Sequence, residues 1–121
     1  MVAVDLNDSV SDTVAQLSDN KNRSKAVVAD ISNEEEVATF INDCIKSFGR
    51  VDGIYANAGV PGSGKPVLEL TVDDWNKTLS INTIGVFLAV KHSAPSLYCS
   101  RSRFNRLYSV RRRNQGQCGG C

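Results

Sequence analysis

The sequence has no long hydrophobic run. Its longest unbroken apolar stretch covers residues 86–90, whereas a membrane-spanning helix needs about 20 apolar residues. The amino terminus also lacks the basic segment followed by an apolar stretch that marks a secretory signal. We therefore expect a cytoplasmic protein that is neither inserted into a membrane nor secreted, and we expect no membrane partner.

Cysteine is nearly absent from the main part of the chain. Of four cysteines, only Cys44 precedes residue 98, and the others are Cys99, Cys118 and Cys121. This distribution does not indicate a disulfide framework for residues 1–97. It favours a reducing environment.

Acidic residues are missing from residues 98–121, which hold six arginines, a net charge of +6. Residues 1–97 hold all thirteen acidic residues and eight basic ones, a net charge of −5. The last segment also has neither the two-residue nor the 3.6-residue apolar period of a strand or helix. In 121 residues, the sequence thus predicts one domain over residues 1–97 and an irregular, basic, cysteine-containing tail over 98–121.

Short apolar runs alternate with helical patterns in residues 1–97. The sequence predicts strands at residues 1–5, 26–29 and 51–56, because continuous apolarity over so few residues is typical of strands buried on both faces of a parallel sheet. It predicts a first helix over residues 10–17. It predicts a second helix that begins at a Ser32–Glu35 capping box and ends at Gly49, and a third from Thr71 to about residue 90. Three strands and three helices in alternation predict a doubly wound α/β fold.

The third predicted helix has a polar side chain in its apolar stripe. Trp75, Leu79, Val86 and Val90 lie at helical spacing, and Asn82 holds the position between Leu79 and Val86. A buried amide without partners costs on the order of 1–3 kcal/mol. We therefore expect Asn82 to have a functional role or to bond to nearby backbone, and the sequence leaves both open.

Polar residues follow the predicted strands where an open α/β sheet binds its ligands. Asp5 could accept hydrogen bonds from the hydroxyls of an adenosine ribose, or could serve the next turn. Asp30 and Ile31 could contact an adenine ring, or could lead into the capped helix. The small residues Ala58 and Gly59 after Asn57 would let a flat group approach the backbone.

Several ordered segments resemble the short-chain dehydrogenase/reductase family over residues 2–97. They are Val-Ala-Val-Asp at 2–5, Ala-Asp-Ile-Ser at 29–32, the segment 49–59 ending in Asn-Ala-Gly, and the helix segment 75–87 around Asn82. The resemblance implies a partial Rossmann-like sheet that binds NAD in preference to NADP. The family loop is usually Asn-Asn-Ala-Gly, and here its first position is Ala56.

The resemblance also implies a role for each candidate residue. Asn82 would help hold a water of the proton relay, and Asp5 would be the acid that favours NAD. Asp30 and Ile31 would contact adenine. The cofactor would also be lined by Asn57, Ala58 and Gly59.

Two motifs of the family are missing from this sequence. No glycine-rich phosphate-binding turn precedes residue 2, and the Tyr-x-x-x-Lys pair is absent, since Tyr98 is followed by Ser102 and Tyr108 by Arg112. We therefore expect an inactive fragment of an NAD(P)-dependent oxidoreductase whose complete relatives act on a small-molecule alcohol or ketone. The alternative is a non-catalytic protein that pairs with a complete family member. Association into a homo-oligomer stays open.

A reading-frame or splice change is the simplest account of residues 98–121, which would then be out of frame or disordered. Zinc binding by His92, Cys99, Cys118 and Cys121 is an alternative, but only one Cys-x-x-Cys is present, so we expect no metal site. Binding of nucleic acid by the three arginines at 111–113 is another. We do not expect it, because no matching fold accompanies so short a basic run.

Overall fold

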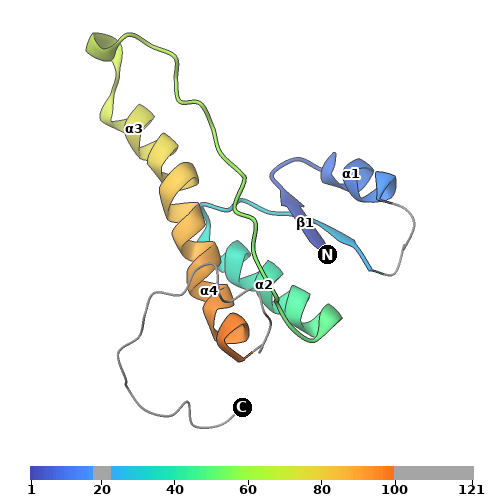
Figure 1. Cartoon of the computed structure of the whole chain (residues 1–121). Coiled ribbons are helices and arrows are strands. Elements are labelled where there is room, and N and C mark those ends of the chain that lie inside the picture. The colour runs from blue at the N-terminus through green and yellow to red at the C-terminus, as the bar shows by residue number, and fades with distance from the viewer. Residues whose placement is uncertain (18–22, 100–121) are drawn as a thin grey trace, which may run out of the picture.

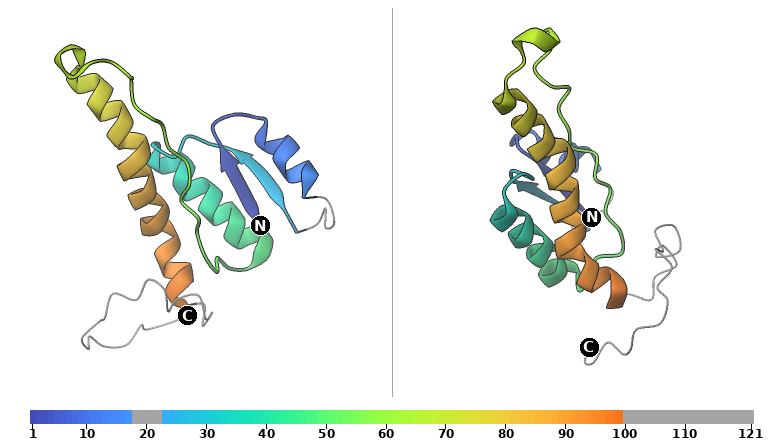
Figure 2. Two further views of the ribbon diagram at one scale, coloured as in Figure 1. Left: turned by 45° about the horizontal axis from the view of Figure 1, so that its top comes forward. Right: turned by 90° about the vertical axis from the view of Figure 1, so that its left-hand side faces the viewer.

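The computed structural model describes residues 1–17 and 23–99. Two strands and a short helix come first, and a long helix in three parts comes last (Figure 1). Helix α1 lies on one side of the strands, and α2 and the long helix lie on the other (Figure 2). In chain order the elements are β1 (Val2–Asp5), α1 (Val10–Gln16), β2 (Lys25–Val28), α2 (Glu34–Phe48), the 3-10 turn η2 (Val67–Glu69), α3 (Val72–Leu79), the π-helical segment η3 (Ser80–Ile84) and α4 (Gly85–Cys99).

The two strands form a parallel pair, as the sequence predicts. Val2 lies opposite Lys25, and Asp5 lies opposite Val28. The ladder extends beyond the strands at both ends, where the Lys25 N–H donates to Met1 O at 2.9 Å and the Ala29 N–H donates to Asp5 O at 3.0 Å. Parallel strands need a crossover connection, and α1 lies within this one.

Helix α2 begins one residue later than the sequence predicts. Its N-cap is Asn33, whose side-chain oxygen accepts the N–H groups of Glu35 at 3.0 Å and Glu36 at 3.4 Å. The predicted Ser32–Glu35 capping box is wrong because the Ser32 hydroxyl donates to Asp30 Oδ1 at 2.7 Å instead. The predicted end at Gly49 is confirmed by its left-handed φ of 82°.

The core lies between α2 and α4. It consists of Val37, Ile41 and Leu88, and four half-buried hydrophobic residues pack against it: Ile31, Phe40, Ile45 and Ile54.

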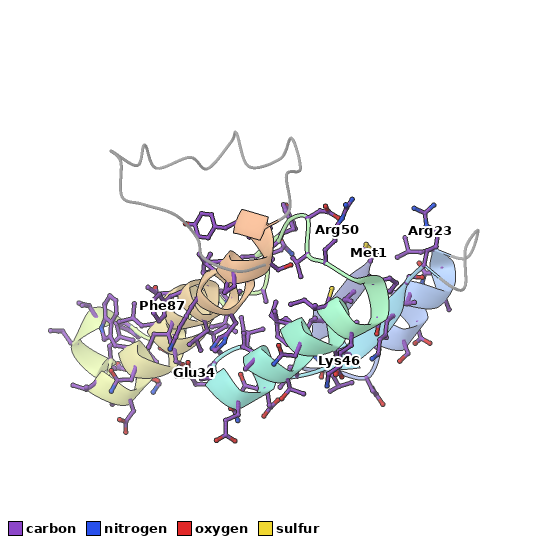
Figure 3. All side chains as sticks on the ribbon, turned by 90° about the horizontal axis from the view of Figure 1, so that it is seen from below. Met1, Arg23, Glu34, Lys46, Arg50 and Phe87 are labelled. Carbon is purple, nitrogen blue, oxygen red and sulfur yellow. The ribbon has the colours of Figure 1, made fainter. Side chains whose placement is uncertain are left out.

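Glu34 at the start of α2 also faces α4 (Figure 3). Its Oε1 lies 2.6 Å from Lys91 Nζ and 3.0 Å from His92 Nε2. These hydrogen bonds, the one from Lys91 first, lower the pKa of the Glu34 carboxyl.

The third predicted strand is wrong. Residues 50–66 have no regular secondary structure and run as an extended segment beside α2 and the long helix (Figure 1). Val51 is buried and Ile54 packs on the core, so the apolar residues are used. A strand also needs a hydrogen-bonded neighbour, and none lies beside residues 51–56 in the described part of the chain.

The long helix begins as predicted and ends later. Thr71 and Asp74 form the predicted capping box, with the Asp74 N–H donating to Thr71 Oγ1 at 3.1 Å and the Thr71 N–H donating to Asp74 Oδ2 at 2.9 Å. The predicted end near residue 90 is wrong, since α4 continues through Pro95 to Cys99, into the first residues of the predicted tail. Pro95 removes one helical hydrogen bond. The last helical turn of α4, after Pro95, is attached to the segment that follows α2, because the Val51 N–H donates to Ser96 Oγ at 2.9 Å.

The buried face of the long helix also differs from the prediction. Leu88 and Ser93 are buried, whereas Trp75 is 57%, Leu79 44% and Val90 54% exposed. The helix packs on α2 through Leu88, which clusters with Val37 and Ile41, and within residues 1–17 and 23–99 no strand lies over the predicted stripe. A stripe of apolar residues predicts a burying face only where a neighbouring element is present to cover it.

Candidate functional site

Two acidic residues lie at the same edge of the sheet. Asp5 is the last residue of β1, and Asp30 follows β2 by two residues. The carboxyl ends of the two strands are adjacent, because Ala29 donates its N–H to Asp5 O at 3.0 Å. The structure therefore brings both predicted acids to the edge where open α/β sheets bind ligands.

The Asp5 carboxylate serves the next turn and stays open to solvent. Its Oδ1 accepts the backbone N–H of Asn7 at 2.9 Å and the Asn7 side-chain amide at 3.3 Å. Both hydrogen bonds use the same oxygen, and the residue is exposed. The turn function that we considered as the alternative is thus present, and the carboxylate is still accessible to hydroxyl donors.

Asp30 and Ile31 are more enclosed than Asp5. Asp30 Oδ1 accepts the N–H and the hydroxyl of Ser32 at 2.8 and 2.7 Å, so the residue leads into the start of α2. Ile31 packs against the core, and a Cβ atom added at Gly85 would lie 2.8 Å from Ile31 Cδ1. Both side chains are half-buried, and Ile31 already contacts protein on its α4 side.

Asn82 fastens the segment after Gly59 to the long helix. Its Nδ2 donates to Val60 O at 2.9 Å, and its Oδ1 accepts the Val60 N–H at 2.8 Å. A Cβ atom at Gly59 would lie 3.1 Å from Asn82 Oδ1, so the absence of a side chain at Gly59 permits this approach. The prediction of a buried amide is wrong, because Asn82 is exposed. The expected bonding to backbone is present, with a partner 22 residues away.

The helix around Asn82 is irregular. Residues Ser80–Ile84 form the π-helical segment between α3 and α4. Such segments add a residue to one turn, release a backbone group from the regular pattern, and are frequent at functional sites. The spacing of the apolar residues does not predict this π-helical segment. The polar Asn82 within the apolar stripe is the sequence feature that coincides with it.

A second contact, which no sequence motif indicates, attaches the same loop to the long helix further along the chain. Lys65 Nζ lies 3.0 and 2.9 Å from the two carboxylate oxygens of Asp74. Gly62 and Gly64 between the two attachments have φ values of 90° and 69°, which glycine adopts without strain. The backbone N–H of Thr71, then Lys65 and the Thr71 hydroxyl, lower the pKa of Asp74 from 3.8 to about 2.

The remaining predictions concern metals, membranes and the catalytic set. No group of three or more His, Cys, Asp or Glu residues within residues 1–17 and 23–99 could hold a metal ion. None of the helices formed by those residues has the length and apolarity needed to span a bilayer. Tyr98 is exposed at the end of α4. The zinc and nucleic-acid alternatives depend on Cys118, Cys121 and residues 111–113, which lie outside the described residues.

Known proteins resemble this chain in sequence and in structure. The family described as Enoyl-(Acyl carrier protein) reductase matches residues 1–113. Levodione reductase of Leifsonia aquatica is 39% identical over 64 residues, which are 53% of this chain and 24% of that protein. NAD+-bound xylitol dehydrogenase has a TM-score of 0.73 at 26% identity, over 79% of this chain and 37% of that one. A short-chain dehydrogenase/reductase from Burkholderia phymatum in complex with NAD has a TM-score of 0.73 at 29% identity, over 79% and 34%.

These comparisons confirm the fold class and extend the sequence resemblance. The neighbours have the Rossmann-type α/β fold, and the family match continues beyond residue 97 to residue 113. This chain spans 24% of the length of levodione reductase and 34% to 37% of the length of the two solved neighbours. The relatives are oxidoreductases, and the xylitol dehydrogenase and Burkholderia phymatum structures hold NAD. The match over residues 1–113 shows that the chain belongs to the short-chain dehydrogenase/reductase family.

Proposed function

We propose that this chain supplies the adenosine-binding side of an NAD site in an oxidoreductase that acts on a small alcohol or ketone. The observation that carries the proposal is the exposed carboxylate of Asp5 at the carboxyl end of β1, beside Asp30 at the end of β2. A carboxylate at this position can accept hydrogen bonds from ribose hydroxyls and repels a 2′-phosphate. The preference for NAD over NADP follows from that repulsion.

The loop of Asn57, Ala58 and Gly59 can accommodate a flat group of the ligand. All three residues are exposed, and two of them have little or no side chain to obstruct an approach to the backbone. Because Asn82 fastens Val60 directly after the loop, the loop is attached to the long helix. Ile31 would contribute apolar surface beside Asp30.

The nicotinamide group, when bound, supplies hydride transfer to or from a carbinol carbon. Asn82 would hold a water through its backbone, which lies in the π-helical segment η3. Its side-chain amide is already bonded to Val60. The family has a lysine four residues after its tyrosine. The residues four positions after Tyr98 and Tyr108 in this chain are Ser102 and Arg112. An arginine stays protonated and does not replace a lysine that tunes a tyrosine. We infer that the 121-residue chain does not turn over substrate.

Calorimetric titration of the full chain with NAD and with NADP tests the proposal. Loss of one charged hydrogen-bond acceptor costs about 1.5–3 kcal/mol, so Asp5→Asn should weaken NAD binding about tenfold or more. NADP binding should weaken less or improve. Asp73→Asn removes an exposed carboxylate elsewhere and is the matched control. Equal affinities of Asp5→Asn and the control for NAD would contradict the assignment, and measurable alcohol oxidation would contradict the inactivity.

A non-catalytic role in pairing with a complete family member is the second candidate. It is favoured by the exposure of Trp75 and Phe87 on the long helix, at 57% and 59%. Large exposed apolar patches mark interaction surfaces. A chain with this role should unfold cooperatively, and Phe87→Ser should abolish co-elution with the partner. Non-cooperative unfolding with strong binding of an apolar-surface dye would count against it.

A further inference from the structure

A hollow of about 340 Å³ lies between β2 and α2. Its apolar lining includes Val27, Val28 and Phe40, and its acidic lining consists of Glu35, Glu36 and Asp43. Neither Asp5 nor the loop at 57–59 lines it. None of the candidate cofactor residues lines the hollow, although Asp30 adjoins it through the bond from its N–H to Glu36.

The strand beside this hollow has a free edge. Lys25 and Ala29 donate their N–H groups to β1. Because alternate residues of a strand direct their backbone groups to opposite edges, the N–H groups of Ala26 and Val28 point away from β1. The described residues supply no second strand on that side. Such an edge can accept an added extended segment through backbone hydrogen bonds.

The charges around the hollow favour a basic segment. Glu35 is exposed, and the donors that Glu36 finds among the described residues are neutral, the Asp30 N–H at 2.7 Å and the Asn33 amide at 2.9 Å. Asp43 is the acidic residue here that faces lysines, Lys25 at 3.8 Å and Lys46 at 3.9 Å. In the part of the chain that the structure describes, three carboxylates thus face two ammonium groups, and the acidic excess would attract arginines, which bind carboxylates in two-point contacts.

This chain contains a segment with the required chemistry and reach. Residues 101–113 hold six arginines and no acid. The carboxyl end of α4 lies close to the end of α2, since Ser96 Oγ accepts the Val51 N–H at 2.9 Å. A dozen extended residues reach about 40 Å, whereas the 15 residues of α2 span about 22 Å. The segment can therefore reach the hollow from the end of α4.

We propose that the arginine-rich segment 101–113 of this chain docks along the free edge of β2, with its arginines over the acidic side of the hollow. The tether raises the effective concentration of the segment to about the millimolar range. Weak edge contacts would then suffice for docking. The segment would cover the N–H groups of Ala26 and Val28 and the apolar floor beside Phe40.

Amide hydrogen exchange in the full chain, followed residue by residue by NMR, tests this docking. The Ala26 and Val28 amides should exchange about tenfold or more slowly in the unmodified chain than in Arg111→Gln/Arg112→Gln. Salt at about 1 M, where the Debye length is about 3 Å, should produce the same loss. Arg50→Gln/Lys77→Gln removes two charges elsewhere and should leave both amides protected. The Ala29 amide, bonded to Asp5 O, reports in each variant that the sheet is intact.

Changes on the hollow side give an independent test. Glu35→Gln/Asp43→Asn should also expose the two amides, whereas the control Glu69→Gln/Asp73→Asn should not. Equal exchange rates in all of these chains would overturn the proposal. Protection that rises with protein concentration would assign the docking to a second copy and overturn docking within one chain. Protection that appears only on addition of a separate arginine-rich peptide would overturn it as well.

Discussion

Residues 1–49 and residues 50–99 have similar apolar runs, but only the first region forms a sheet. Val2–Asp5 and Lys25–Val28 pair in parallel, while residues 51–56 stay extended and pair with no other described segment. The apolar residues of the second region are nevertheless used, because Val51 is buried and Ile54 packs on the core. An apolar run therefore determines that a segment is buried, and the presence of a neighbour determines whether it becomes a strand.

The two longest helices also differ in how many of their apolar residues are buried. Helix α2 buries Val37 and Ile41 against α4, whereas the long helix buries Leu88 and leaves Trp75, Phe87 and Val90 exposed. The large apolar residues of α2 repeat at spacings of three and four on one face, whereas the long helix has apolar residues on more than one side. The available partner decides which side becomes core.

The sharpest test of this difference is a pair of truncations on α4. Leu88→Ala should lower the free energy of unfolding by about 2–5 kcal/mol, because it leaves a cavity in the core. Val90→Ala should change it by less than about 1 kcal/mol, because that side chain is 54% exposed. Chemical denaturation of both variants measures the contrast. Similar losses would mean that the outer side of α4 is also packed.

The contact between Ile31 and α4 can be broken by a single methyl group. A Cβ atom at Gly85 would lie 2.8 Å from Ile31 Cδ1 and 3.2 Å from Ile31 O. We expect Gly85→Ala to destabilise the protein by about 1–3 kcal/mol through overpacking, although alanine favours helices. Thermal unfolding should show part of the loss restored by Ile31→Val, which removes Cδ1. A stabilised Gly85→Ala variant would contradict the close contact.

The attachment of the loop to the long helix can be tested at Asn82. Asn82→Ala removes both hydrogen bonds to Val60 and should destabilise the protein by about 0.5–1.5 kcal/mol. The Val60 amide should also exchange faster with solvent. Asn76→Ala, at an exposed position in α3, shares the gain in helix propensity and is the control. If Val60 exchange is unchanged, another contact holds the loop.

The smallest expected effect concerns the Lys65–Asp74 contact at low pH. The pKa of Asp74 is lowered to about 2 in the folded chain from 3.8, so its stabilising contribution is present above about pH 4 and is lost as the pH falls toward 2. Lys65→Gln should raise this pKa toward 3.8 without reaching it, because the Thr71 N–H is the larger cause. An NMR titration of the Asp74 carboxyl measures both. An unchanged pKa in Lys65→Gln would exclude the lysine contact in solution.

Local signals predicted part of the fold correctly. The β1 and β2 strands, the Gly49 end of α2 and the Thr71–Asp74 capping box are confirmed. Each depends on residues within a few positions of one another. The sequence places the cap of α2 one residue early because Ser32 and Asn33 are both good capping residues, and the hydrogen bond from Ser32 to Asp30 decides between them.

The candidate site was only partly predictable for a related reason. Asp5 and Asp30 were recognised from strand ends and from the family resemblance, and the structure places them at one edge. The contact between Lys65 and Asp74 joins residues of a loop and a helix, and no sequence period connects them. The exposed position of Asn82 depends on which side of the long helix meets α2.

The sequence by itself determined the α/β class, the parallel strand pair, most helix ends and the family, because these follow from local propensity, apolar runs and ordered motifs. The tertiary structure alone decided that residues 51–56 do not form a strand, that α4 buries Leu88 rather than the Trp75 stripe, and that Asn82 bonds to Val60. The physical reason is that pairing and burial require a partner surface, and the identity of that partner is a property of the folded chain.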